Sequence, residues 1–172
     1  DLTGDWSSDV CSSDLVEIID NNLMNDKINL IIENYSFVYN LRKIENFEEH
    51  REFCLHDMQH FLDVARLMYI MSLEKHLNIP KHIIYTTALL HDIGRGEEYE
   101  NGTPHNIASR EIAKTILQQC KYSAEETDEI LEAIGSHRNN TEKLNSLSNV
   151  LYKCDKLSRN CFNCEAIDGC KW

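Results

Sequence analysis

The 172-residue chain has few of the residues that interrupt helices or anchor a protein in a membrane. It contains only two prolines, and no stretch alternates apolar and polar residues for long enough to predict a strand. No apolar run approaches the ~20 residues that span a bilayer, and we recognise no secretory signal, repeat or low-complexity linker. With a hydrophobic content of 42%, these absences predict one all-α domain, a compact multi-helix bundle, in the cytoplasm.

Basic residues are also scarce. The 17 Lys and Arg stand against 29 Asp and Glu, which gives a net charge of −12. Six of the acids lie in residues 1–23, so the rest of the chain carries −6. A mildly acidic surface gives no support for a nucleic-acid or membrane partner, and we expect neither. The sequence does not indicate an oligomeric state.

The first residues do not resemble a protein sequence. Residues 5–15, DWSSDVCSSDL, resemble one reading frame of a sequencing-library adapter, so we expect residues 1–15 to be a disordered artefact. The alternative is a natural leader rich in Ser and Asp. Residues 16–25 form an uncertain leader that contains Met24, a candidate start. We expect the folded domain over residues 26–160 and a cysteine-containing tail, packed on that domain, over residues 161–172.

Apolar residues repeat at three- and four-residue spacing along most of the domain, which predicts helices. A polar joint is expected over 45–51 and a polar loop with two glycines over 95–104. A capping-box pattern of Ser123 and Glu126 marks the start of one helix. The expected helices span residues 26–42, 57–77, 81–93, 104–119, 124–138 and 144–157.

Histidine and aspartate fall on the apolar sides of several of these helices. A His-Asp pair occurs twice, as His56-Asp57 and His91-Asp92, and with 8 histidines in the chain one such pair carries little information. More informative is that His60, His91-Asp92 and Asp155 each share a face with apolar residues of a different helix. Buried imidazoles and carboxylates are costly unless they are satisfied, and both are ordinary ligands of divalent cations. The sequence therefore predicts a metal site at which three helices meet.

The order and context of these residues resemble the HD-domain superfamily of metal-dependent phosphohydrolases, over roughly residues 40–160. The resemblance rests on CLHDMQHFLDVA around His60, ALLHDIG around His91-Asp92 and CDKLSR around Asp155. It implies an HD-domain bundle that holds one or two divalent ions, Mn, Mg, Fe, Co or Ni. It also implies hydrolysis of a phosphomonoester or phosphodiester by metal-activated hydroxide, with His91 and Asp92 as catalytic residues. The substrate would be a small phosphorylated molecule, nucleotide-like in character.

The resemblance also implies further site residues. In members with two metals, the added ligands are histidines between the HD pair and the last Asp, a place taken here by His105 and His137. Asp92 would then bridge the two metals, although His137 could instead contact substrate phosphate. His56, one turn before His60, is expected beside the ligands or against substrate. The candidate phosphate-binding residues, which closely follow the ligands, are Arg95, Lys156 and Arg159.

Two other functions stay open at this point. An HD scaffold with six ligands can hold two irons and activate oxygen, as in members that resemble inositol oxygenase. A regulatory module could instead bind a nucleotide without cleaving it, but such modules usually lose some of the ligands that this chain retains. Metal content together with an activity screen separates these functions from hydrolysis.

The remaining cysteines suggest a second metal site. Cys161 and Cys164 have the two-residue spacing of a metal knuckle, and Cys170 follows. Cys54, six residues before His60, is the predicted fourth ligand of a structural zinc site, in preference to Cys154 and Cys120. Reduced cysteines in a loosely ordered tail are the alternative, and an iron–sulfur cluster is less favoured because nothing else suggests electron transfer.

Overall fold

The computed structural model describes residues 26–138 and 146–170, so the predictions for residues 1–25, 139–145 and 171–172 lie outside it. The regular structure of the described residues is helical, which confirms the all-α prediction. Residues 26–32 form a first helical segment. The helices that follow are α2 (Tyr35–Glu48), α3 (Met58–Glu74), α4 (Lys81–Leu90), α5 (Arg95–Asn101), α6 (His105–Gln119), α7 (Ala124–Ser136) and α8 (Ser146–Leu157), and two short 3-10 turns close the described tail, η1 (Cys161–Asn163) and η2 (Ile167–Gly169).

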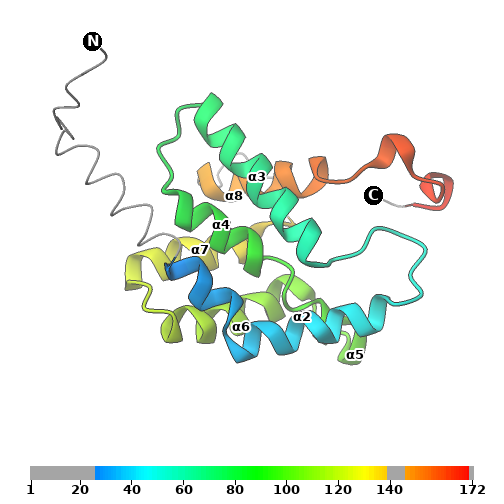
Figure 1. Cartoon of the computed structure of the whole chain (residues 1–172), viewed down its shortest axis with the longest axis horizontal. Helices are drawn as coiled ribbons and strands as arrows, with labels where there is room; N and C mark the ends of the chain where they lie inside the picture. The colour runs from blue at the N-terminus through cyan, green and yellow to red at the C-terminus, as the bar shows by residue number, and fades with distance from the viewer. Residues whose placement is uncertain (1–25, 139–145, 171–172) are drawn as a thin grey trace, which may run out of the picture.

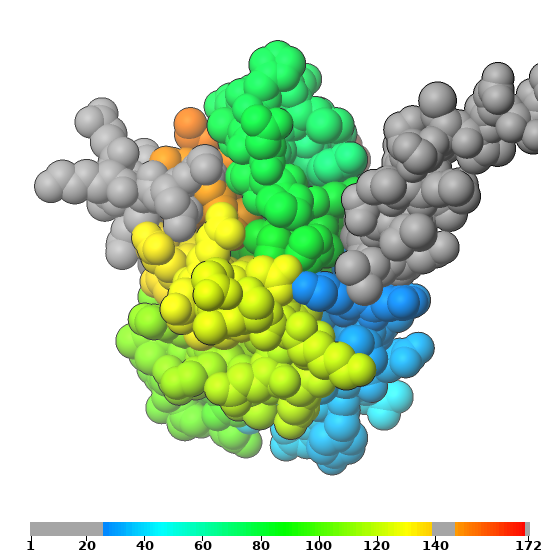
Figure 2. Space-filling model, turned by 90° about the vertical axis from the view of Figure 1, so that its left-hand side faces the viewer, coloured from blue at the N-terminus to red at the C-terminus, as the bar shows by residue number. Residues whose placement is uncertain are grey.

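The helices pack around one apolar core (Figure 1). Helix α3 contacts α4 and α8, α6 contacts α7, and α5 lies against both α2 and α6. Figure 2 shows α6 and α7 in yellow-green and yellow below the green α4, beside the blue segment that precedes α2. No helix among the described residues combines the length and apolar character needed to cross a membrane.

Helix α3 illustrates how the sequence places a site residue. Asp57, the carboxylate of the first His-Asp pair, caps the helix by accepting a hydrogen bond from the backbone N–H of His60. Apolar residues at helical spacing, Phe61, Val64 and Met68 among them, are buried against the core. His60 follows the cap closely and shares the buried face, so its imidazole also points inward. The cap and the apolar stripe together fix the direction of this side chain.

The predicted helix over 26–42 is wrong, because the chain breaks at Asn34. The Asn34 side chain accepts hydrogen bonds from the backbone N–H groups of Ser36 and Phe37, so that a new helix, α2, starts there. Helix α2 then continues to Glu48, through half of the predicted polar joint. The polar joint was misassigned because Glu48 is buried by partners far along the sequence, which a local pattern cannot reveal.

The predicted polar loop over 95–104 is also wrong, because it contains helix α5 (Figure 1). This helix has almost no apolar periodicity, and ion pairs of Lys43 on α2 with Glu97 and Glu100 tie it to the domain. Its end is set by Gly102, whose φ of 79° is left-handed and which donates its N–H to the carbonyl of Glu98. The glycine that suggested a loop is in fact the helix terminator.

Gly94 allows α6 to approach the start of α5 closely. A Cβ atom at Gly94 would lie 2.2 Å from the backbone nitrogen of Ser109. We expect Gly94→Ala to lower the free energy of unfolding by about 2–3 kcal/mol, since backbone must shift. Gly135→Ala is the matched control, because its Cβ would meet only the Arg110 side chain, at 3.4 Å. Urea unfolding of both variants measures this, and equal stabilities would contradict the close-approach argument.

Candidate metal centre

Six buried side chains from five parts of the fold meet at one point between the helices. Each predicted ligand of the metal site is among them. Their ligand atoms form two groups, and within each group all atoms lie within 4.8 Å of one another. The six are His60 on α3, His91 and Asp92 just after α4, His105 on α6, His137 just after α7 and Asp155 on α8.

The first group joins His60, His91, Asp92 and Asp155. The Oδ1 atom of Asp155 lies 3.4 Å from Nε2 of His60 and 3.6 Å from Nε2 of His91. The Nε2 atom of His91 is also 3.5 Å from Oδ2 of Asp92. Two imidazole nitrogens and two carboxylates therefore surround one small space, which is a common donor set for a divalent ion.

The second group joins Asp92 to His105 and His137. The other carboxylate oxygen of Asp92, Oδ1, lies 3.3 Å from Nε2 of His105 and 3.5 Å from Nε2 of His137. The two imidazole nitrogens lie 3.3 Å apart. Asp92 thus offers one oxygen to each group, which is the geometry that a bridging carboxylate needs.

All four imidazoles are held by their Nδ1 atoms, which leaves Nε2 directed at the centre. His91 and His137 contact the backbone carbonyls of Ala88 and Ile134, at 2.7 and 2.6 Å. The corresponding partners of His105 and His60 are the Glu98 carboxylate, at 2.6 Å, and the Ser158 hydroxyl, at 3.2 Å. With the proton on Nδ1, the Nε2 lone pair is available as a metal ligand.

Three of the polar atoms that face this centre have no partner among the described residues. Nε2 of His91, Oδ1 of Asp92 and Oδ1 of Asp155 are buried, and no described residue gives them a hydrogen bond. Orphaned buried polar groups cost free energy, and a bound cation is the partner that all three would share. The donor set and these three atoms therefore fit a divalent metal.

The electrostatic balance at the centre favours ionised carboxylates and added positive charge. Burial acts to raise the pKa of Asp92, but Arg95 and His91 outweigh it and hold the pKa well below its usual range. Burial likewise acts to lower the pKa of His91, but Asp92 and Asp155 outweigh it and raise the pKa. Burial lowers the pKa of His60 and of His105, so these imidazoles stay neutral and able to ligate.

The sequence profile of the HD domain matches residues 57–160 of this chain, the part that contains all six of these side chains. The chain belongs to the HD-domain family. This confirms the resemblance to the HD-domain superfamily of metal-dependent phosphohydrolases that its three motifs suggested.

Individual relatives agree with this membership. An uncharacterized protein of Clostridium beijerinckii is 46% identical over 147 residues, which cover 86% of this chain and 92% of that protein. A ribonuclease Y of Desulfotalea psychrophila is 36% identical over 101 residues, which cover 59% of this chain but only 18% of that protein. A crystal structure described as a predicted HD superfamily hydrolase, from an uncultured Thermotogales bacterium, superposes with a TM-score of 0.57 at 22% identity. The match covers 77% of this chain and 66% of that chain, and it shows only that the two folds are alike.

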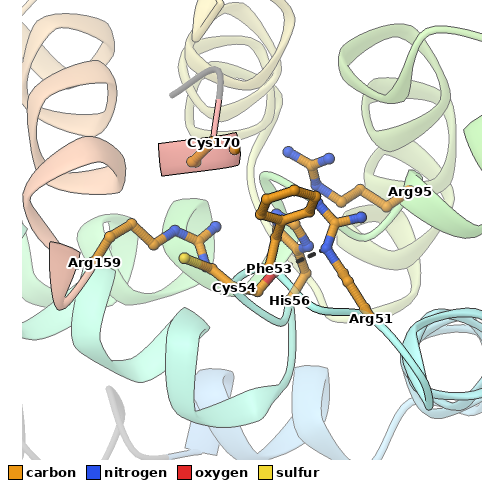
Figure 3. Close-up of a pocket in the computed structure, with 8 residues that line it drawn as sticks. Arg51, Phe53, Cys54, His56, Arg95, Arg159 and Cys170 are labelled. Carbon is orange, nitrogen blue, oxygen red and sulfur yellow. Dashed lines mark hydrogen bonds between the residues drawn. The ribbon is translucent and has the colours of Figure 1, made fainter. Parts of the chain in front are cut away.

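Two cavities open beside the metal centre of this HD domain. The larger, of about 440 Å³, is lined by residues from the α2–α3 connection, from α5 and from the end of the chain (Figure 3). The smaller, of about 390 Å³, is lined by the ligands His105, His137 and Asp155 and by charged side chains. Arg95 lines both cavities. The larger cavity is lined by Arg51, Phe53, Cys54, His56, Arg95, Arg159, Gly169 and Cys170.

The predicted phosphate-binding residues all reach these cavities. Arg95 donates from Nε to Oδ2 of Asp92 at 2.8 Å, and it lies at the first residue of α5. Arg159 donates to the carbonyl of Leu55 at 2.8 Å and lies 3.1 Å from Nε2 of His60. Lys156 lines the smaller cavity. The sequence reasoning missed Arg51, which lines the larger cavity and is distant in sequence from the ligands. It also missed Arg138, which lines the smaller cavity and directly follows the ligand His137.

His56 lies beside the ligands, as an auxiliary residue would. Its Nε2 is 3.6 Å from Oδ2 of Asp92, and its Nδ1 contacts Glu48 at 2.5 Å. Burial lowers the pKa of His56 to about 4. Burial acts to raise the pKa of Glu48, but hydrogen bonds from His56 and Tyr99 outweigh it and lower the pKa to about 2. A neutral imidazole thus donates to a carboxylate, and sequence reasoning missed that carboxylate altogether.

We expect Glu48→Gln to lower the free energy of unfolding at pH 7 by about 1–3 kcal/mol, since the charged acceptor of hydrogen bonds from His56 and Tyr99 is lost. The pKa of Glu48 is lowered from 4.5 to about 2, so its contribution is complete above pH 4.5 and disappears as pH falls toward 2. The difference from the wild type should shrink over that window. Urea unfolding between pH 7 and pH 3 measures it, with exposed Glu49→Gln as control. A difference that is constant with pH would contradict the ionised state of Glu48.

The cysteines divide into two sets. Cys120 and Cys154 are buried in the core, and burial raises the pKa of the Cys154 thiol to about 12. The predicted zinc ligands instead line one small cavity of about 100 Å³ together with Phe53 and Ile167. All four are free thiols, and among the described residues no three of their sulfur atoms lie within 4.8 Å of one another. The four-cysteine zinc site remains a prediction. Its members are Cys54, Cys161, Cys164 and Cys170.

Proposed function

We propose that this HD-domain protein is a metal-dependent phosphohydrolase that cleaves a phosphomonoester or phosphodiester without a covalent enzyme intermediate. The observation that carries the proposal is the shared carboxylate of Asp92, which faces two ligand groups and whose buried Oδ1 has no hydrogen-bond partner in the described part of the chain. Divalent ions held by these residues would supply hydroxide near neutral pH and neutralise the charge of phosphate oxygens. His60, His91, Asp92 and Asp155 would hold one ion, and His105 and His137 with Asp92 a second.

The residues around the centre have separate roles in this proposal. Arg95 and Arg159 border the ligands and bring guanidinium donors to the larger cavity, where they bind non-reacting phosphate oxygens. Arg95 is fixed in place by its bond to Asp92, so it is preorganised rather than recruited. Neutral His56, whose Nδ1–H is held by Glu48, accepts a hydrogen bond from substrate through Nε2 beside Asp92. Lys156 is a further cation at the smaller cavity.

The substrate that this site favours is small, anionic and nucleotide-like. A cavity of about 440 Å³ is within the usual size of small-molecule sites. The described residues that line it include three arginines and no carboxylate, although the whole chain carries a net charge of −12. Phe53 adds an aromatic ring to the same wall, on which a base could stack. Because the ribonuclease Y relative is named for action on RNA, an RNA oligonucleotide belongs in the test beside small nucleotides.

The decisive experiment is a hydrolysis screen with Mn²⁺, Mg²⁺, Co²⁺ and Ni²⁺ added separately to metal-stripped protein. Substrates are nucleoside monophosphates, nucleoside diphosphates, cyclic and linear dinucleotides, a generic aryl phosphate and a short RNA. We expect metal-dependent phosphate or nucleotide release from at least one small substrate. Oxygen consumption by the iron-loaded protein without hydrolysis would replace the proposal with oxygenase chemistry. Nucleotide binding without turnover under any metal would replace it with a regulatory role.

A further inference from the structure

The end of the described chain lies against the domain, but few of its own contacts hold it there. None of residues 160–170 is buried, and Phe162 is 90% exposed. The backbone hydrogen bonds of η1 and η2 are local turns, from Asn163 to Asn160 and from Cys170 to Ile167 among them. A short segment with no buried residue does not offset its own ordering entropy by packing, so another interaction is needed to keep it in place.

Four thiols gather where this segment meets the domain. Cys161, Cys164 and Cys170 come from the tail and Cys54 from the α2–α3 connection, and all four line one cavity of about 100 Å³. Figure 1 shows the same arrangement in outline, with the red end of the chain on the side of the loop that joins α2 to α3. The residues are far apart in sequence, so the fold rather than local spacing brings Cys54 to the other three.

We propose that these four cysteines bind one thiophilic divalent ion, of which zinc is the expected example, and that the ion fastens the tail to the domain. Cys161 and Cys164 have the two-residue spacing of a zinc knuckle. Zinc–sulfur bonds of about 2.3 Å place the four sulfurs about 4 Å apart. No three of these sulfurs lie within 4.8 Å in the described structure, so binding draws the tail closer. The four thiols release their protons as the ion binds.

The domain side of this site is already fixed by two arginines. Arg51 donates from Nε to the carbonyl of Cys54 at 3.1 Å, and Arg159 donates to the carbonyl of Leu55 at 2.8 Å. The backbone that presents the Cys54 thiol is therefore restrained at two successive residues. A ligand held on restrained backbone is preorganised for metal binding.

A fastened tail would shape the larger cavity beside the HD centre. Phe53, Cys54 and Cys170 line both the cysteine cavity and the larger cavity, so the two share a wall. In Figure 3, Cys170 lies on the tail, across the opening from His56. Arg159 extends toward the same space from the left of the view. The ion would therefore hold one wall of the proposed substrate cavity in place. The six HD ligands are not part of the cysteine site.

Titration of the reduced, metal-stripped full-length chain with Co²⁺ tests the site without reference to hydrolysis. Co²⁺ bound to several thiolates gives an intense sulfur-to-cobalt charge-transfer absorption, which histidine and carboxylate ligands do not give. With enough Co²⁺ to fill the HD centre as well, we expect this absorption to reach the intensity of one thiolate-bound ion per chain in the wild type and in the matched control Cys120→Ala. It should be lost in the double variant C161S/C164S, whose tail should also be cleaved after Arg159 several-fold faster by trypsin.

Each other outcome overturns the four-thiolate site. Absence of the charge-transfer band in the wild type, with both exposed and core thiols shown reduced by mass spectrometry, excludes it directly. A band that persists in C161S/C164S assigns the ion to other residues. Iron–sulfur absorption after anaerobic purification would identify a different cofactor. Circular dichroism checks that the double variant is folded. Because the cobalt titration uses no substrate, its failure leaves the proposed hydrolase unaffected.

Discussion

Asp92→Asn protein is expected to lose hydrolytic activity by about 10³-fold or more and to bind less metal at both ligand groups. Asp92 is the one residue that belongs to both groups, and its two oxygens face different histidines. An amide keeps the shape of the side chain but not the charge, and it cannot serve as an anionic bridge. Metal analysis after dialysis, with kcat and KM for the best substrate from the screen, measures both effects.

The other His-Asp pair provides the matched control. Asp57→Asn makes the same chemical change in His56-Asp57, where the carboxylate caps α3 and contacts no other ligand of the centre than the His60 backbone. Asparagine is as good a helix cap as aspartate, so stability, metal content and activity should all stay close to the wild type. Full metal content and substantial turnover in Asp92→Asn, with native helicity by circular dichroism, would falsify the assignment of Asp92 as the shared ligand.

The inward direction of His60, His91, His137 and Asp155 could be predicted because it depends on local information, whereas His105 was placed by the family resemblance. An apolar stripe on a helix tells which way a neighbouring histidine or aspartate points, and this was enough for His60 and Asp155. His91 and His137 follow the ends of α4 and α7, where each contacts the carbonyl three residues earlier. That contact satisfies an end-of-helix acceptor and aims the opposite ring nitrogen at the centre.

The parts that could not be predicted depend on packing between distant segments. Glu48 sits at a polar place in the sequence, but His56 and Tyr99, 8 and 51 residues away, bury its carboxylate. Helix α5 is polar throughout and is held by α2, so no periodicity marks it. Glu98 lies on this same helix, so its contact with the His105 imidazole could not be predicted either. A carboxylate that supports a metal ligand has the same local pattern as a solvated one, and only the fold distinguishes them.

The number of ions at the centre gives the second large effect. We expect His105→Ala and His137→Ala each to lower the metal content of Mn²⁺-loaded protein from near two ions to near one per chain. Each change removes one of three donors from the second group but leaves His60, His91, Asp92 and Asp155 intact. Hydrolysis should fall by about 10²-fold or more, since only one ion would remain to stabilise the negative charge of the transition state. Elemental analysis and isothermal titration measure the stoichiometry directly.

His82→Ala is the control for a lost histidine. His82 is half-buried and bonds to Glu126 at 2.7 Å, near the start of α7, whereas His137 follows the end of that helix. The variant should therefore keep two ions and full activity, with only a modest loss of stability. If wild-type protein never binds more than one ion while His137→Ala raises KM with kcat unchanged, His137 is a substrate contact. One ion would then perform the chemistry, and the short contact between His105 and His137 would mark the phosphate position instead of a second metal.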